Sequence, residues 1–146
     1  MKLANMDRKQ LHARLTRAFT MYIKLRDTDE DGNGKCFTCG KDVRLGSRNC
    51  SAGHAMPKNK YKNYIFAEEL VRLQCGYCNK WVQGDWPAFF AGLRDIYGLD
   101  KVLSFIDGAL EDEPYWGENR YIFEIGYFEQ RCKELEREKQ EARDGN

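Results

Sequence analysis

With 146 residues, the chain is long enough to bury a hydrophobic core but short for two typical domains, so one domain over residues 1–146 is expected. Hydrophobic residues make up 42% of the chain and charged residues 32%, as in soluble globular proteins. The net charge is only +1, and since no apolar run approaches the roughly 20 residues that span a bilayer, we expect no membrane partner.

The charge is divided unevenly along the chain. The first 80 residues carry +8 and residues 81–146 carry −7. A basic half suits a polyanion such as nucleic acid, although charged faces that contact only solvent would have the same composition. The basic half also holds five of the six cysteines. Because the first residues do not resemble a signal peptide, we expect reduced thiols in a cytoplasm.

The first predicted element is a helix over residues 7–26. Its apolar residues recur at alternating steps of four and three, as on one face of a helix: Leu11, Leu15, Ala18, Tyr22 and Leu25. Residues 27–34 are polar and contain glycine, so a loop follows. Asp27, Asp29, Asp31 and Gly32 match the start of an EF-hand loop, but Thr38 stands where the bidentate glutamate belongs. We therefore expect no calcium site.

Short strands and turns are predicted from residue 35 to residue 80, and helices over residues 86–142. Pro87 fits the first turn of a helix that Gly98 ends, and Asp100 could cap the next helix. The last helix, over about residues 118–142, has an apolar stripe that is expected to pack on the first helix: Ile122, Ile125, Phe128, Cys132 and Leu135. Residues 143–146 are expected to form a tail.

The cysteines form two CxxC pairs that are separated by 35 residues, which predicts one tetrahedral zinc: Cys36 and Cys39, then Cys75 and Cys78. Disulfides are the structural alternative, and a reducing compartment disfavours them. A zinc ion with four thiolates has no open coordination position, so its role is structural. Cys50 could lie near this site or simply be buried.

The order of motifs resembles the phage NinG (Rap) recombination proteins. The resemblance rests on Cys36-x-x-Cys39-Gly40, Ala52-Gly53-His54, Gln74-Cys75-x-x-Cys78-Asn79 and Gly84. It extends to Tyr22-Ile23-x-Leu25-Arg26-Asp27 and Tyr97-Gly98. Those proteins are similar in turn to HNH, or ββα-metal, nucleases, including phage endonuclease VII. The resemblance implies an α+β fold with a small zinc-braced ββα-metal (HNH-like) core over residues 35–85, flanked by N-terminal and C-terminal helices.

The same resemblance implies an endonuclease that hydrolyses branched or structured DNA, such as a Holliday junction, in the cytoplasm of a bacterial host. His54 matches the general base that activates water, and Asn79 the position that supplies an oxygen to a catalytic Mg²⁺ or Mn²⁺. Two departures concern that ion. Asn49-Cys50-Ser51 stands where the family tends to carry an aspartate, and Leu70 replaces the middle asparagine of the HNH triad. Asp85 could supply the missing carboxylate or instead cap the Pro87 helix.

Basic residues around the histidine are candidates for DNA contacts: Lys58, Lys60, Lys62 and Arg48. A solubilising loop is the plainer explanation for the three lysines. The alternative to a nuclease is a non-catalytic zinc module that binds structured DNA or a recombination partner. Two copies acting together, as a homodimer, would suit symmetric cutting of a junction.

Overall fold

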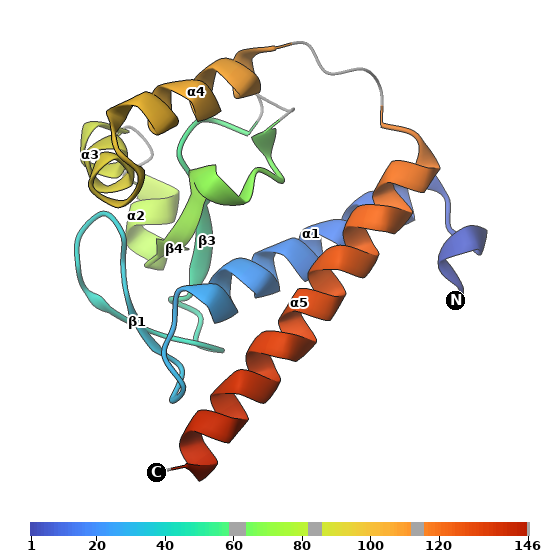
Figure 1. Ribbon diagram of the computed structural model, residues 1–146, viewed down its shortest axis with the longest axis horizontal. Coiled ribbons are helices and arrows are strands. Elements are labelled where there is room, and N and C mark those ends of the chain that lie inside the picture. The colour runs from blue at the N-terminus through green and yellow to red at the C-terminus, as the bar shows by residue number, and fades with distance from the viewer. Residues whose placement is uncertain (59–63, 82–85, 112–115, 146) are drawn as a thin grey trace.

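The computed structural model describes residues 1–58, 64–81, 86–111 and 116–145, and it combines helices with two small antiparallel sheets (Figure 1). A short 3₁₀ turn, η1 (Leu3–Asn5), precedes helix α1 (Arg8–Arg26). Strands β1 (Asn33–Lys35) and β2 (Asp42–Arg44) form the first hairpin, and β3 (Ser51–His54) and β4 (Val71–Gln74) form the second, with η3 (Glu68–Leu70) before β4. Helices α2 (Gly76–Trp81), α3 (Trp86–Tyr97), α4 (Leu99–Leu110) and α5 (Glu118–Asp144) follow.

Helices α1 and α5 lie side by side and run in the same direction (Figure 1). Asp7 caps α1, because its carboxylate accepts from the backbone N–H of Gln10 while the Gln10 side chain accepts from that of Asp7. The predicted packing of the two apolar stripes is confirmed in one buried cluster: Leu11, Leu15, Ala18, Phe19, Tyr22, Ile23, Val71, Tyr121, Ile125 and Phe128. The two stripes therefore form the core of one chain.

Two boundaries differ from the sequence predictions. Helix α4 begins at Leu99, so its N-cap is Gly98 with a φ of 86°, and Asp100 lies within the first turn instead of capping it. Helix α5 continues to Asp144, two residues beyond the predicted end, so the first two residues of the predicted 143–146 tail are helical. Polar contacts explain this extension: Lys139 donates to the carbonyls of Thr28 and Asp29, and Arg143 donates to that of Glu30.

An ionic cluster at the end of α1 fixes the second hairpin. The carboxylate of Asp27 accepts from Arg26 Nε at 2.7 Å, from Arg72 Nη1 at 3.4 Å and from the backbone N–H of Leu73 at 3.0 Å. Arg26 also donates to the carbonyls of Glu68 and Val71 at 2.7 and 2.6 Å. The first acid of the EF-hand-like loop is therefore engaged in binding protein groups.

Helices α3 and α4 cover a second apolar cluster next to this hairpin: Ala55, Met56, Tyr64, Leu70, Phe89, Leu93, Val102 and Ala109. Phe37 joins it by packing edge-on against Phe89 at 4.8 Å between ring centroids. No helix in the described parts of the chain is long and apolar enough to cross a membrane. The hairpin of β3 and β4 is thus held between α1 and the α3–α4 pair (Figure 1).

Candidate functional site

The two CxxC pairs meet in space. The sulfur atoms of Cys36, Cys39, Cys75 and Cys78 all lie within 4.8 Å of one another. The Sγ atoms of Cys39 and Cys75 are 3.8 Å apart, which is about the separation of two thiolates on a tetrahedral zinc with Zn–S bonds of about 2.3 Å. The chemistry and spacing of these four side chains fit one structural zinc ion.

Each pair is placed by a short loop at the end of a strand. Cys36 follows β1, and its backbone N–H donates to Lys41 O, while Gly40 N–H donates to Cys36 O at 2.9 Å. Gly40 has a φ of 75°, a conformation that favours glycine and closes the first knuckle. Cys75 follows β4 directly, and Cys78 lies in α2 with its N–H 3.4 Å from Cys75 Sγ. Such N–H donors stabilise metal-bound thiolates.

The thiols differ in how readily they ionise. Burial opposes ionisation of Cys36, but backbone N–H groups of Cys39, Cys75 and Thr38 outweigh it and lower its pKa to about 7. Cys50 packs in the same hydrophobic cluster as Cys36, Cys75 and Cys78, but it is not one of the four grouped sulfurs, and burial raises its pKa. Cys50 is therefore a buried neighbour of the zinc site.

The predicted histidine ends strand β3, at the opposite end of the hairpin from the cysteines. His54 pairs with Val71, whereas Ser51 pairs with Gln74, the residue before Cys75. Three strand residues, roughly 10 Å, therefore separate His54 from the zinc end of β3. The Nε2 atom of His54 lies 2.9 Å from the carbonyl oxygen of Ile65, and its ring packs edge-on against the buried Tyr64.

This environment determines the tautomer and the protonation state of the His54 imidazole. A carbonyl oxygen can only accept, so Nε2 carries the proton and Nδ1 keeps a free lone pair. Burial lowers the pKa of His54 to about 4, the charge of Lys58 acts in the same direction, and the bond to Ile65 opposes them. At neutral pH the ring is therefore uncharged and able to accept a proton at Nδ1.

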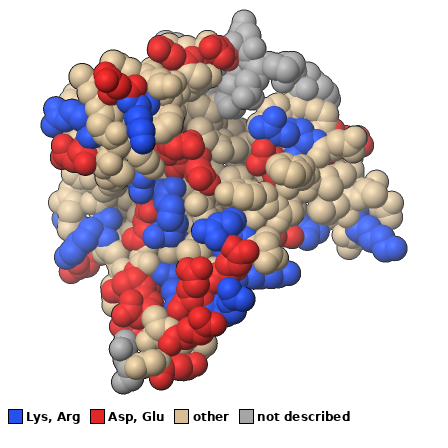
Figure 2. Space-filling model, viewed as in Figure 1, with Lys and Arg blue, Asp and Glu red and all other residues tan. Residues whose placement is uncertain are grey.

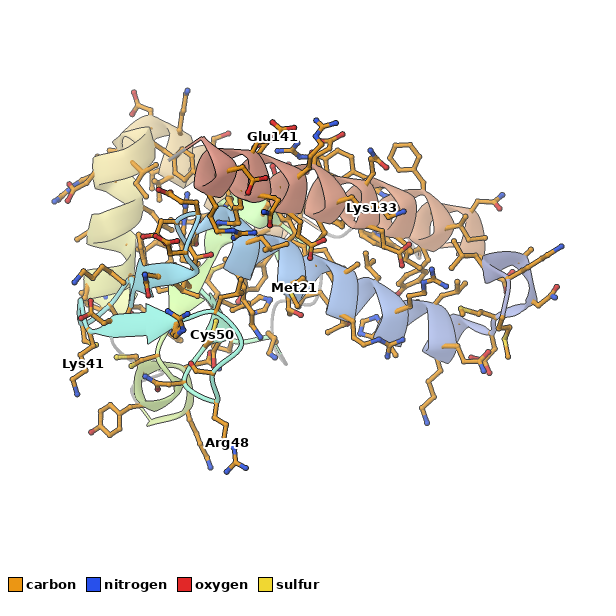
Figure 3. The ribbon with its side chains drawn as sticks, turned by 90° about the horizontal axis from the view of Figure 1, so that it is seen from below. Met21, Lys41, Arg48, Cys50, Lys133 and Glu141 are labelled. Atoms are coloured by element: carbon orange, nitrogen blue, oxygen red, sulfur yellow. The ribbon has the colours of Figure 1, made fainter. Side chains whose placement is uncertain are left out.

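The other predicted site residues are distributed around this hairpin. Asn79 is half-buried in α2, the helix that follows β4 and packs against β3. Lys58 is exposed four residues after His54. Arg48 is exposed in the loop before β3, and its side chain extends away from the fold (Figure 3). Lys60, Lys62 and Asp85 lie outside the described residues.

Basic and acidic side chains are interspersed on the face shown in Figure 2, so the charge division along the sequence does not produce one uniform patch there. Arg72, another basic residue of the hairpin, has a side chain that is only 12% exposed. It contacts Asp27 and the Tyr97 hydroxyl and lies over the rings of Phe37 and Tyr97. Arg72 therefore stabilises the fold and is not a surface DNA contact.

Two connections around the hairpin had not been predicted from the sequence. One is the cluster of Asp27 with two arginines described above. The other joins Gln74 to Thr38, whose Nε2 and Oγ1 atoms are 2.6 Å apart. Arg26, Asp27 and Gln74 belong to the motifs that resemble the phage proteins, and that membership was the available signal in the sequence.

Comparison with known proteins gives one match. A family model described as "Bacteriophage Lambda NinG protein" matches residues 1–138. No curated protein and no solved structure matches the chain.

Proposed function

Because the chain belongs to the NinG family, which is related to phage recombination, we propose that it is a metal-dependent endonuclease acting on branched or structured DNA. In this proposal a zinc ion on the four cysteines braces an HNH-like core, and His54 is the general base. The substrate is a phosphodiester bond, and the nucleophile is water.

The state of His54 is the observation that carries the proposal. Its Nε2–H is directed at the Ile65 carbonyl, so Nδ1 is the basic atom and its direction is fixed. A positioned, neutral imidazole can take a proton from water as that water attacks phosphorus. The lowered pKa has two effects: it keeps the ring unprotonated at neutral pH, and it makes the ring a weaker base than free histidine.

The order of elements supports the same proposal. An antiparallel hairpin, β3 and β4, is followed by a helix that packs against β3, which is the order that the name ββα-metal describes. One zinc knuckle is the turn between β1 and β2, and the other joins β4 to α2, so zinc would tie the first hairpin to one end of the second. A rigid scaffold of this kind keeps a catalytic side chain in place.

Binding of a catalytic Mg²⁺ or Mn²⁺ would depend strongly on ligands from the DNA substrate. In the described residues, the four cysteines are the one group of three or more His, Cys, Asp or Glu side chains close enough to hold an ion. Mg²⁺ commonly keeps several waters and binds substrate phosphates with few protein ligands. Asn79 would supply an amide oxygen, and the ion would stabilise negative charge on the phosphate and leaving oxygens.

DNA contacts would come from exposed basic residues near the hairpin. Lys58 follows β3, and Arg48 precedes it, so the two flank the strand that carries His54. Each phosphate that they neutralise would contribute about −0.9 to the slope of log affinity against log salt on duplex DNA. Replacing both with glutamine should therefore reduce the magnitude of that slope by about two.

Cleavage of a synthetic four-way or flapped junction with Mg²⁺ or Mn²⁺ tests the proposal. We expect His54→Ala to reduce cleavage about 100- to 10,000-fold, the usual contribution of a general base. Its zinc content and junction affinity should equal those of the parent. His12→Ala is the control for loss of an imidazole, since the His12 ring contacts Tyr121 and Phe66 and lies on α1, away from β3. Equal cleavage by parent and His54→Ala would refute the role of His54.

A second function follows from the weak basicity of His54. A ring with a pKa of about 4, in a described structure that groups no acidic side chains into an ion site, would also suit a zinc module that binds structured DNA without cutting it. Tight junction binding by a parent protein that leaves the DNA intact with both divalent ions would establish this alternative.

A further inference from the structure

The side chain of Gln74 connects the zinc site to the strand that carries His54. Gln74 ends β4, and it is 6% exposed, one of two buried polar or charged residues in the described chain. Its Nε2 atom lies 2.6 Å from the hydroxyl oxygen of Thr38, to which it donates. A buried amide keeps such a bond because its loss would leave a desolvated polar group.

The partner of Gln74 belongs to the first zinc knuckle. Thr38 lies between Cys36 and Cys39, and both of these sulfurs are in the four-cysteine group. Zinc binding would restrict the backbone of this four-residue loop, Cys36 to Cys39, and with it the position of the Thr38 hydroxyl. The Gln74 amide is therefore held by the same loop that holds the metal.

The other side of Gln74 packs directly on the backbone before His54. A Cβ atom built on Gly53 would lie 1.7 Å from Oε1, 2.4 Å from Cδ and 2.8 Å from Cγ of Gln74. These distances are far below van der Waals contact, so Gly53 is required for the amide to occupy this place. Since Gly53 directly precedes His54, the amide limits where the histidine backbone can move.

We propose that Gln74 is a positioning residue that transmits the order of the zinc knuckle to the imidazole of His54. The path runs from the zinc ligands through the Thr38 hydroxyl to the Gln74 amide, and from there to Gly53. Its catalytic consequence rests on the nuclease proposal, but its effect on the imidazole does not. Experiments can therefore refute the nuclease proposal and the positioning role of Gln74 independently of each other.

Two variants remove the connection from its two ends. Gln74→Met keeps a long side chain over Gly53 but cannot donate to Thr38, and Thr38→Val keeps the shape of Thr38 but loses the hydroxyl. The double variant completes a mutant cycle. Ser47→Ala is the matched control, because the Ser47 hydroxyl donates a hydrogen bond to the Arg44 carbonyl in the exposed loop between β2 and β3.

The decisive readout is the tautomer and ring order of His54 in long-range ¹H–¹⁵N spectra of the full chain, with zinc content measured in parallel. We expect the parent to show a single Nε2–H form. In Gln74→Met, Thr38→Val and the double variant, the two ring nitrogens of His54 should give signals averaged between the two tautomers, while each protein retains one zinc per chain. The averaging in the double variant should be no greater than in either single variant. Ser47→Ala should resemble the parent.

Cleavage gives a second readout where the parent cuts DNA. We expect kcat to fall roughly 10- to 100-fold in each single variant, with KM within twofold, since small misplacements of a catalytic group have effects of this size. An unchanged His54 spectrum in zinc-loaded Thr38→Val would overturn the proposal. If Gln74→Met loses zinc or folding, Thr38→Val decides alone. A parent that does not cut DNA refutes the nuclease, and the spectra still decide the role of Gln74.

Discussion

Replacing Asp27 with alanine should destabilise the protein strongly, because Asp27 is the anion between two buried guanidinium groups. The side chains of Arg26, Asp27 and Arg72 are only 19%, 13% and 12% exposed. Removing one partner of a buried ion pair typically costs about 3–5 kcal/mol, since the remaining charge is left without compensation. The variant also removes the acceptor of the Leu73 N–H, which lies in the second hairpin.

The assay is equilibrium unfolding in urea, with the zinc concentration held constant. We expect Asp27→Ala to lower the free energy of unfolding by about 3–5 kcal/mol without a change in m value. Asp27→Asn keeps an oxygen for the Leu73 N–H and should lose less, about 1–3 kcal/mol. Asp31→Ala, at an exposed position of the same loop, should stay within about 0.5 kcal/mol of the parent. An Asp27→Ala protein as stable as Asp31→Ala would refute this explanation.

Three further predictions concern the imidazole, the zinc and the last helix. Because the pKa of His54 is about 4 in the folded chain and about 6.5 in the unfolded chain, the unfolded chain takes up the proton first as pH falls. Stability should therefore decline from pH 6.5 to pH 4 by up to ~3 kcal/mol in the parent, and less in His54→Gln, in urea titrations. A zinc chelator should release one zinc ion per chain and abolish ordered structure around the four cysteines while α1 and α5 remain helical, and unchanged hairpin signals in NMR spectra after release would contradict this. Lys139→Met removes two donations to carbonyls of the 28–29 turn and should lower unfolding free energy by about 1–2 kcal/mol, whereas exposed Lys133→Met should have little effect.

Periodicity and spacing were sufficient to predict the packing of the two long helices and the grouping of the four cysteines. The stripes through Leu15 and Ile125 reflect a period that a helix imposes, and the two CxxC pairs reflect the geometry of one tetrahedral ion. Both signals are local in sequence or have a fixed chemical meaning. For this reason they could be interpreted without knowing how distant segments pair.

The long-range contacts around the second hairpin could not be predicted in this way. The donation from Gln74 to Thr38 spans 36 residues, and that from Leu73 to Asp27 spans 46 residues. Each depends on where β4 lies relative to the end of α1 and to the first hairpin, which local sequence patterns do not specify. The Ile65 carbonyl that accepts a hydrogen bond from the imidazole is a backbone group, so no side-chain motif indicates it. Gly98 ends α3, as predicted, and it is also the N-cap of α4, which had not been predicted.

Some charged side chains from the basic and the acidic half of the sequence form contacts within the fold. Lys139 and Arg143, from the acidic half, donate to the carbonyls of the loop after α1. Arg26, from the basic half, donates to the carbonyls of Glu68 and Val71. Some of the charge that suggested a polyanion partner therefore stabilises the fold, and the exposed Lys58 and Arg48 are the basic residues that we propose as DNA contacts.

X-ray diffraction from crystals soaked in Mn²⁺, recorded at the zinc and manganese absorption edges, tests the central claim most directly. We predict zinc among the sulfurs of Cys36, Cys39, Cys75 and Cys78, and manganese close enough to His54 for one water molecule to contact both the ion and Nδ1. Zinc elsewhere, or manganese bound away from His54 in crystals that also contain junction DNA, would contradict it.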